Sequence, residues 1–241
     1  MIGFASPMFA KADGPPPVVG PMNPATLFGG AMKGGYYNFT DAASLAINAD
    51  GTGGVPAVNG ACRSVLDLSP NGNRLRNSVA SATRRATGVE TSGAGYGLYQ
   101  FAVEGWTNIP QPFEIVACVE QVAFNATDAR IVASAASLGL LQGSASGKVR
   151  FYDTVYGTEF TPGLATEFVI DGYFDGGSGL VGYNGGAMVA SPGAGQSLSG
   201  LLLGSDTGGN NRSQVRFKHL LVIGRALTPS ERAGVTLWMQ S

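Results

Sequence analysis

The sequence predicts an all-β protein: an antiparallel jelly-roll β-sandwich with an extended Pro-rich N-terminal arm and a short C-terminal helix. Glycine supplies 37 and proline 13 of the 241 residues, which favours turns and short strands. Charged residues make up 13% of the chain, about half of the roughly 25% usual in soluble domains, so long solvated helices are disfavoured. Short apolar alternations separated by Gly, Asn, Asp and Ser clusters recur about every 8 to 15 residues, which is typical of a sandwich or barrel.

The first element is the arm, residues 1–26. It holds six prolines, among them Pro15, Pro16 and Pro17, and proline neither donates to a sheet nor continues a helix. Its apolar side chains are the expected anchors: Phe4, Met8 and Phe9. They would pack either on a partner chain or on the arm's own domain, and both alternatives stay open. No basic segment precedes the apolar stretch, which argues against a signal peptide.

Residues 27–241 are expected to form one domain. In its first part we expect a short helix at residues 41–45 and strands near residues 63–67 and 98–103. The stronger strand candidates are residues 113–121, 129–135, 138–142, 149–152, 167–174, 179–183, 187–190, 201–204 and 215–223.

Two local patterns sharpen this expectation. Asn184-Gly185-Gly186 between two apolar stretches predicts a hairpin turn, because Asn and Gly accept the positive φ of tight primed turns. In the last strand, strict alternation would place one set of side chains on a single face: Val215, Phe217, His219, Leu221 and Ile223.

The closing helix has a clear start signal. Thr228 offers an N-cap hydroxyl, Pro229 suits the first helical position, and Glu231 completes a capping box. Val235, Trp238 and Met239 follow at helical spacing, so we expect an apolar stripe that packs on the sandwich.

Charge and cysteine content narrow the function classes. The 15 basic and 16 acidic residues leave a net charge of -1, which disfavours nucleic acid as a partner. No apolar run approaches the roughly 20 residues of a membrane span. Cys62 and Cys118 lie in apolar surroundings without metal-ligand spacing, so we expect two buried free thiols, a disulfide being the alternative.

Catalytic, metal and cofactor signals are missing from the sequence. His219 is the only histidine and no nucleophile-elbow pattern accompanies it. Glu167, Val169 and Asp171 would share one strand face, but Val169 stands where a carboxylate pair for glycoside cleavage needs an acid. We therefore expect no enzyme, no catalytic residue, no metal and no cofactor.

The order of elements resembles the concanavalin A-like lectin/glucanase superfamily, the sandwich of laminin-G-type domains. The resemblance is carried by residues 113–120, 167–176 and 181–189, and by the closing strand, Arg225-Ala226-Leu227-Thr228 turn and helix. The entry region, from residues 35–45 through Asp50-Gly51-Thr52 to residues 66–73, is similar to such sandwiches in phage and prophage structural proteins.

These resemblances imply a function. The main expectation is a non-enzymatic structural or adhesion component of a phage-like particle, located in the virion. The arm would bind other virion proteins, in a homo-oligomer for which a trimer is favoured, and the sandwich would contact host glycans. The alternatives are a free lectin-like carbohydrate-binding module and a glycoside hydrolase. Sugar contacts are expected at four residues: Trp106, Tyr173, Tyr183 and Asn184.

Overall fold

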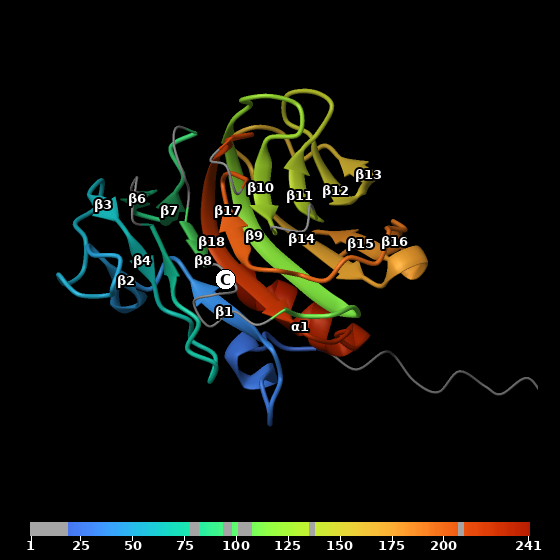
Figure 1. Cartoon of the computed structure of the whole chain (residues 1–241), viewed down its shortest axis with the longest axis horizontal. Coiled ribbons are helices and arrows are strands. Elements are labelled where there is room, and N and C mark those ends of the chain that lie inside the picture. The colour runs from blue at the N-terminus through green and yellow to red at the C-terminus, as the bar shows by residue number, and fades with distance from the viewer. Residues whose placement is uncertain (1–18, 78–81, 94–97, 101–107, 135–137, 207–209) are drawn as a thin grey trace, which may run out of the picture.

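The computed structural model describes residues 19–77, 82–93, 98–100, 108–134, 138–206 and 210–241. In this part of the chain two antiparallel sheets stack face to face, which confirms the predicted all-β sandwich (Figure 1). The expected arm anchors Phe4, Met8 and Phe9, the prolines Pro15, Pro16 and Pro17, and Trp106 lie outside the described residues.

The first sheet, sheet A, has the strand order β16-β15-β14-β9-β18-β7-β6-β3, with β1 also paired to β18. Long apolar strands form its centre, where β9 and β18 run side by side (Figure 1). The strands are β1 (Gly34–Asn38), β3 (Ala61–Cys62), β6 (Ala82–Arg85), β7 (Gly88–Glu90), β9 (Phe113–Ala123), β14 (Glu167–Phe174), β15 (Leu180–Tyr183), β16 (Val189–Ala190) and β18 (Gln214–Ile223).

The second sheet, sheet B, has the order β13-β12-β11-β10-β17-β8-β5-β4-β2. Its strands are β2 (Leu45–Ala46), β4 (Ser64–Val65), β5 (Leu75–Arg76), β8 (Leu98–Gln100), β10 (Arg130–Ala133), β11 (Leu138–Gln142), β12 (Val149–Asp153), β13 (Val155–Phe160) and β17 (Leu201–Leu203). Strand β13 was not expected from the sequence. Thr158 ties this edge strand to the neighbouring sheet, since its hydroxyl donates to the Ala190 carbonyl over 3.1 Å.

Three short 3-10 helices and one α-helix complete the described elements: η1 (Pro24–Leu27), η2 (Ala42–Ser44), η4 (Gly176–Ser178) and α1 (Pro229–Met239). The predicted capping box of α1 is confirmed, because the Thr228 hydroxyl accepts from the Glu231 amide and the Glu231 carboxylate accepts from the Thr228 amide. The predicted hairpin turn is also confirmed: Asn184 and Gly185 have φ of +49° and +73°. None of the described helices is long and apolar enough to cross a bilayer.

Two apolar layers hold these elements together. The larger one fills the space between the sheets, around aromatic side chains such as Phe113, Phe151 and Phe174. The smaller one lies between the outer face of sheet A and α1, and includes Val235 and Met239 of the predicted helical stripe. Sheet A is therefore buried on both faces over much of its length, as its continuous apolar strands require.

The prediction of one common face for the alternating residues of β18 is wrong. The register between β9 and β18 shifts between Phe217 and His219, which leaves Lys218 as an extra residue. A bulge of this kind reverses the side-chain alternation beyond it. Val215 and Phe217 consequently face the core between the sheets, whereas the later members of the set, His219, Leu221 and Ile223, lie on the α1 side.

The last part of the expected arm packs on its own domain. The Met22 amide donates to the Gly234 carbonyl on α1 over 2.9 Å. A Cβ at Gly234 would lie 2.8 Å from the Met22 Cβ, so glycine permits this close approach. Met22, which the sequence assigned to the arm, is therefore in contact with α1.

Candidate functional site

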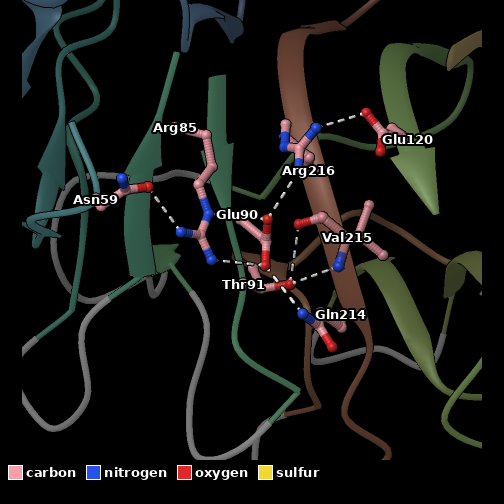
Figure 2. A network of polar contacts seen from close by, with 8 residues as sticks. All are labelled: Asn59, Arg85, Glu90, Thr91, Glu120, Gln214, Val215 and Arg216. Carbon is pink, nitrogen blue, oxygen red and sulfur yellow. Dashed lines mark hydrogen bonds and ion pairs between the residues drawn. The ribbon is translucent and has the colours of Figure 1, made fainter. Parts of the chain in front are cut away.

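The outer face of sheet A carries a row of charged side chains that lie opposite one another on neighbouring strands. Glu120 and Glu90 flank Arg216 from β9 and β7, and each carboxylate bonds to its guanidinium (Figure 2). Glu90 also accepts from Arg85 over 3.0 and 3.1 Å and from Gln214 over 2.9 Å. Burial alone would raise the pKa of Glu90, but these donors outweigh it and lower that pKa to about 2.

The acceptor at the centre of this network is fully engaged. Glu90 is 4% exposed and receives four hydrogen bonds from three side chains, which belong to strands β6 and β18. Nearby, the Thr91 hydroxyl accepts from the Val215 amide (Figure 2). The same hydroxyl donates to the Ser213 carbonyl over 2.7 Å. Because the Glu90 carboxylate already accepts four hydrogen bonds, few polar groups are left to bind a ligand. The network holds strands β6, β7, β9 and β18 together.

A second polar cluster lies under α1. Arg232 of the helix donates to both oxygens of Glu114, over 2.8 and 3.0 Å, and also lies 2.6 Å from the Asp171 carboxyl. The Leu227 amide donates to Glu114 as well, over 2.7 Å. Burial raises the pKa of Asp171 well above its ordinary value, and the neighbouring Glu114 raises it further. A protonated Asp171 leaves this buried trio electrically neutral, so the cluster anchors α1 to sheet A.

A pocket of about 410 Å³ opens beside this anchor, between the β15 hairpin and α1. Its walls are mainly apolar, with Val169, Leu180 and Met188 on one side and Ala233 on the other. Asp171 and Arg232 line it too, but both are engaged in the anchor just described. The polar side chains of the pocket are few: Thr236 also lines it, and Asp171 Oδ1 is buried there without a hydrogen-bond partner in the described residues.

The outer face of sheet B is organised differently, around two tyrosines and two arginines that we call the tyrosine–arginine ladder. Tyr152 of β12 and Tyr156 of β13 are register partners, with ring centroids 5.4 Å apart. The Arg130 guanidinium lies over the Tyr152 ring at 5.1 Å, and that of Arg150 over the Tyr156 ring at 3.9 Å. Such contacts between guanidinium and ring faces are stabilising and hold both groups in place.

Asp128 fixes one end of the ladder. Its carboxylate forms an ion pair with Arg150 and accepts from the Tyr156 hydroxyl over 2.8 Å. This hydrogen bond to an anion raises the pKa of Tyr156. Beneath the ladder, Leu141 of β11 lies opposite Arg150 and is only 1% exposed, because the long side chains of its neighbours cover it.

Tyr156 is the most exposed residue of this ladder. It is 59% exposed, the largest value among the described large apolar side chains that lie at the surface. An exposed tyrosine held in one orientation by an ion pair offers a flat apolar surface with hydrogen-bonding groups at its rim. The ladder is therefore the candidate binding site.

Of the residues expected to contact sugar, three lie in the described part of the chain, and Tyr173 lies apart from Tyr183 and Asn184. Tyr173 lies on the outer face of sheet A, where its hydroxyl donates to Asp175 over 3.0 Å. Tyr183 lies on the inner face and stacks on Phe160 with centroids 5.5 Å apart. The Asn184 side-chain oxygen is engaged by the Val169 amide over 2.8 Å.

His219 is a buried structural residue. Its Nδ1 lies 3.1 Å from the hydroxyl of Tyr36, which in turn accepts from Trp238 Nε1 over 3.0 Å. The tautomer of the His219 ring sets which of the two groups donates in this hydrogen bond. Burial, with Lys218 nearby, lowers the pKa of His219 to about 4, so the ring stays neutral around pH 7. The prediction of two buried free thiols, Cys62 and Cys118, is confirmed.

Tyr152 and Tyr156 were not predicted from the sequence as site residues. A usable signal was present: in Val149-Arg150-Phe151-Tyr152 the buried positions alternate with outward ones, and the outward positions hold arginine and tyrosine. In β13 the alternation of buried and outward side chains is interrupted at Gly157. A side chain at this position would collide with Ser191.

Comparisons with known proteins concern the fold. No family model and no curated protein sequence matches the chain. Among solved structures, a Trypanosoma rangeli sialidase bound to a difluorinated nononic acid is similar with a TM-score of 0.62 and 16% identity, over 92% of this chain and 36% of that one. A mutant of the same sialidase with trans-sialidase activity gives a TM-score of 0.55 and 17% identity, over 83% and 34%. This chain thus spans about a third of the length of those enzymes.

These findings bear on two expectations. The expectation that the protein is not an enzyme is corrected, because solved structures of similar fold include sialidases, which are enzymes. The resemblance to the lectin/glucanase sandwiches agrees with these carbohydrate-active neighbours, whereas neither neighbour is a virion protein.

Proposed function

We propose that this chain is a carbohydrate-binding β-sandwich and that it binds sugar on the tyrosine–arginine ladder of sheet B. The observation that carries the proposal is Tyr156, which is 59% exposed and yet held in place by Arg150 on its ring and Asp128 on its hydroxyl. The carbohydrate-active neighbours support a sugar as the ligand class. Because a shared fold does not establish a shared function, the proposal depends on the geometry of the ladder.

The chemistry of the ladder suits a sugar ring. One face of a pyranose exposes C–H groups, which lose contact with water when they pack on a tyrosine ring. The hydroxyls at the edge of the ring need charged or polar partners, and Asp128 and the arginines provide them at the rim. Because these side chains are already fixed by one another, little conformational entropy is lost on binding.

Binding of the isolated chain to a glycan array tests the proposal. We expect a defined set of glycans to bind, and Tyr156→Ala to weaken that binding by at least about tenfold, the equivalent of roughly 1.4 kcal/mol. Tyr173→Ala is the matched control, since it removes a tyrosine from the outer face of sheet A. A blank array, or full binding by the Tyr156→Ala variant, would refute the proposal.

A structural or adhesion role in a phage-like particle is a second proposal, and it rests on the sequence. The six prolines of residues 1–26, with Phe4 and Phe9 among them, suit an arm that packs on a neighbouring subunit of a virion, in a trimer or another closed oligomer. The two proposals are compatible, because a virion component that displays the ladder would bind host glycans. Removal of residues 1–18 should leave a folded chain that no longer enters particles, and normal incorporation would argue against this role.

A further inference from the structure

The ladder carries an uncompensated positive charge. It contains two guanidinium groups and one carboxylate, and Asp128 forms its ion pair with Arg150. Arg130 forms no ion pair within the described part of the chain, and its Nη1 is buried there without a hydrogen-bond partner, so a ligand would reach the guanidinium through its other nitrogens. A half-buried guanidinium without a counter-ion is uncommon, because burial of an unpaired charge costs free energy.

Arg130 is nevertheless held firmly. Its guanidinium lies over the Tyr152 ring, and its backbone amide donates to the Asn211 carbonyl over 2.6 Å. The Ser213 hydroxyl also donates to the Arg130 carbonyl. The charge is thus fixed at one end of the ladder by ring and backbone together.

The two ends of the ladder differ in charge: the Tyr156 end holds the neutral Asp128–Arg150 ion pair, and the Tyr152 end holds the unpaired Arg130 guanidinium. Asp128 lies at the Tyr156 hydroxyl, whereas Arg130 lies on Tyr152, the next ring along. A ligand that crosses both rings therefore meets a hydrogen-bond acceptor at one end and a guanidinium at the other. Guanidinium binds planar oxyanions through paired hydrogen bonds, and an acceptor carboxylate selects hydroxyls while it repels anions.

We propose that the ladder selects anionic sugars: the ring packs on Tyr156, and Arg130 binds the acidic group of the sugar. This inference rests on the proposed sugar-binding function and names its ligand class. A ring carboxylate and a sulfate ester share the chemistry that Arg130 would recognise, so the experiment has an arm for each.

Isothermal titration with matched trisaccharides provides the test. The probes are trigalacturonic acid, its methyl ester, the neutral galactose trisaccharide and a sulfated galactose trisaccharide. We expect the acid to bind at least about tenfold more tightly than its methyl ester, which matches the usual strength of one charge-assisted hydrogen bond. The preference should weaken at high salt, since the exposed part of the interaction is screened.

Substitutions at Arg130 test whether this residue causes the preference for the acid over its methyl ester. Arg130→Gln should abolish the preference for the acid over the ester and leave binding of the neutral sugar unchanged, and Arg130→Lys should restore part of it. Arg225→Gln, which removes an arginine paired with Glu231 beside α1, is the control and should keep the full preference. Thermal unfolding of each variant shows that the fold is retained.

The possible outcomes separate the two proposals. If acid, ester and neutral sugar bind equally and Tyr156→Ala abolishes them all, the anionic selectivity is refuted and sugar binding stands. If the preference survives Arg130→Gln, its assignment to Arg130 is refuted. If the sulfated sugar alone binds tightly, sulfate is the acidic group selected. If no probe binds and the glycan array is blank, the proposed function itself fails.

Discussion

Sheet A and sheet B both present charged residues outward, but the charges meet different surroundings. On sheet A, Glu90 receives four hydrogen bonds, and Glu114 and Asp171 share Arg232 beneath α1. On sheet B, Tyr156 is left 59% exposed and Arg130 keeps its charge without a carboxylate partner in the described residues.

The difference separates groups that hold the fold from groups that are free to bind. Buried ion pairs whose acceptors already receive several hydrogen bonds are costly to break, and few of their atoms can bind a ligand. An exposed ring with an uncompensated guanidinium contributes little to stability, so its fixed geometry calls for another explanation. Under the proposed function, sheet A is the stabilising face and sheet B the binding face, and the substitutions below test this division.

Deletion of Lys218 should have the largest effect on stability. This residue is the extra one in the bulge of β18, and without it the residues on one side of the bulge would point to the wrong face. We expect the deletion variant to be unfolded by circular dichroism. Lys218→Ala keeps the bulge and loses only a partly exposed ion pair with Glu167, so it should cost less than about 1 kcal/mol. A deletion variant with the wild-type unfolding midpoint would contradict the role of the bulge.

Arg232→Met should come next, at about 3 to 5 kcal/mol, because it leaves Glu114 and Asp171 buried without their cation. Urea unfolding at neutral pH measures the loss. Arg225→Met is the matched control: it breaks the Arg225–Glu231 pair, which is more exposed, and should cost less than about 1 kcal/mol.

Further substitutions in the same cluster separate the effect of the Arg232 charge from the effect of its packing. Glu114→Gln and Asp171→Asn, added to Arg232→Met, remove the orphaned acids and should recover part of the lost stability. No recovery would mean that Arg232 acts through packing and not through charge.

Glu90→Gln should cost about 2 kcal/mol at pH 7, since the lost partner is a carboxylate bonded to arginines. The folded pKa of Glu90 is about 2, below the ordinary 4.5 of a glutamate. Its contribution is therefore complete above about pH 4.5 and disappears as pH falls toward 2. Unfolding of both proteins in urea at pH 7 and pH 3 should show a gap that narrows in acid; a constant gap would contradict this account.

Tyr156→Ala should have the smallest effect, about 0.5 to 1 kcal/mol, which is the value of an exposed cation–π contact. The same substitution at Tyr36, a 2% exposed tyrosine of sheet A bonded to Trp238, should cost several times more. Equal losses in thermal unfolding would remove the distinction between the two faces.

The sequence predicted the fold well because its signals were local. Apolar alternation located most of the long strands, Asn184-Gly185 located a hairpin turn, and Thr228 with Glu231 located the start of α1. Each of these signals acts within a few residues, where side-chain chemistry and backbone geometry are directly linked.

The bulge and the site were not predictable in the same way. Nothing in the sequence around Lys218 indicates a bulge, because a residue is extra only relative to its register with the partner strand β9. The ladder assembles Arg130, Tyr152 and Tyr156 from three strands, so it depends on sheet order and register. Tyr173 and Tyr183 were each expected to contact sugar, and they lie on opposite faces of sheet A. Tyr183 pairs with Ile170, which is three residues before Tyr173 on β14 and therefore points to the other face.

The most direct measurement of the central claim is an NMR titration of the ¹⁵N-labelled chain with trigalacturonic acid. Sugar binding on sheet B predicts that shift changes cluster at residues 128–130 and 149–160, and that Tyr156→Ala removes them. Changes concentrated instead along α1, β14 and the hairpin that follows would place the ligand beside the pocket on sheet A and contradict the division between the two faces.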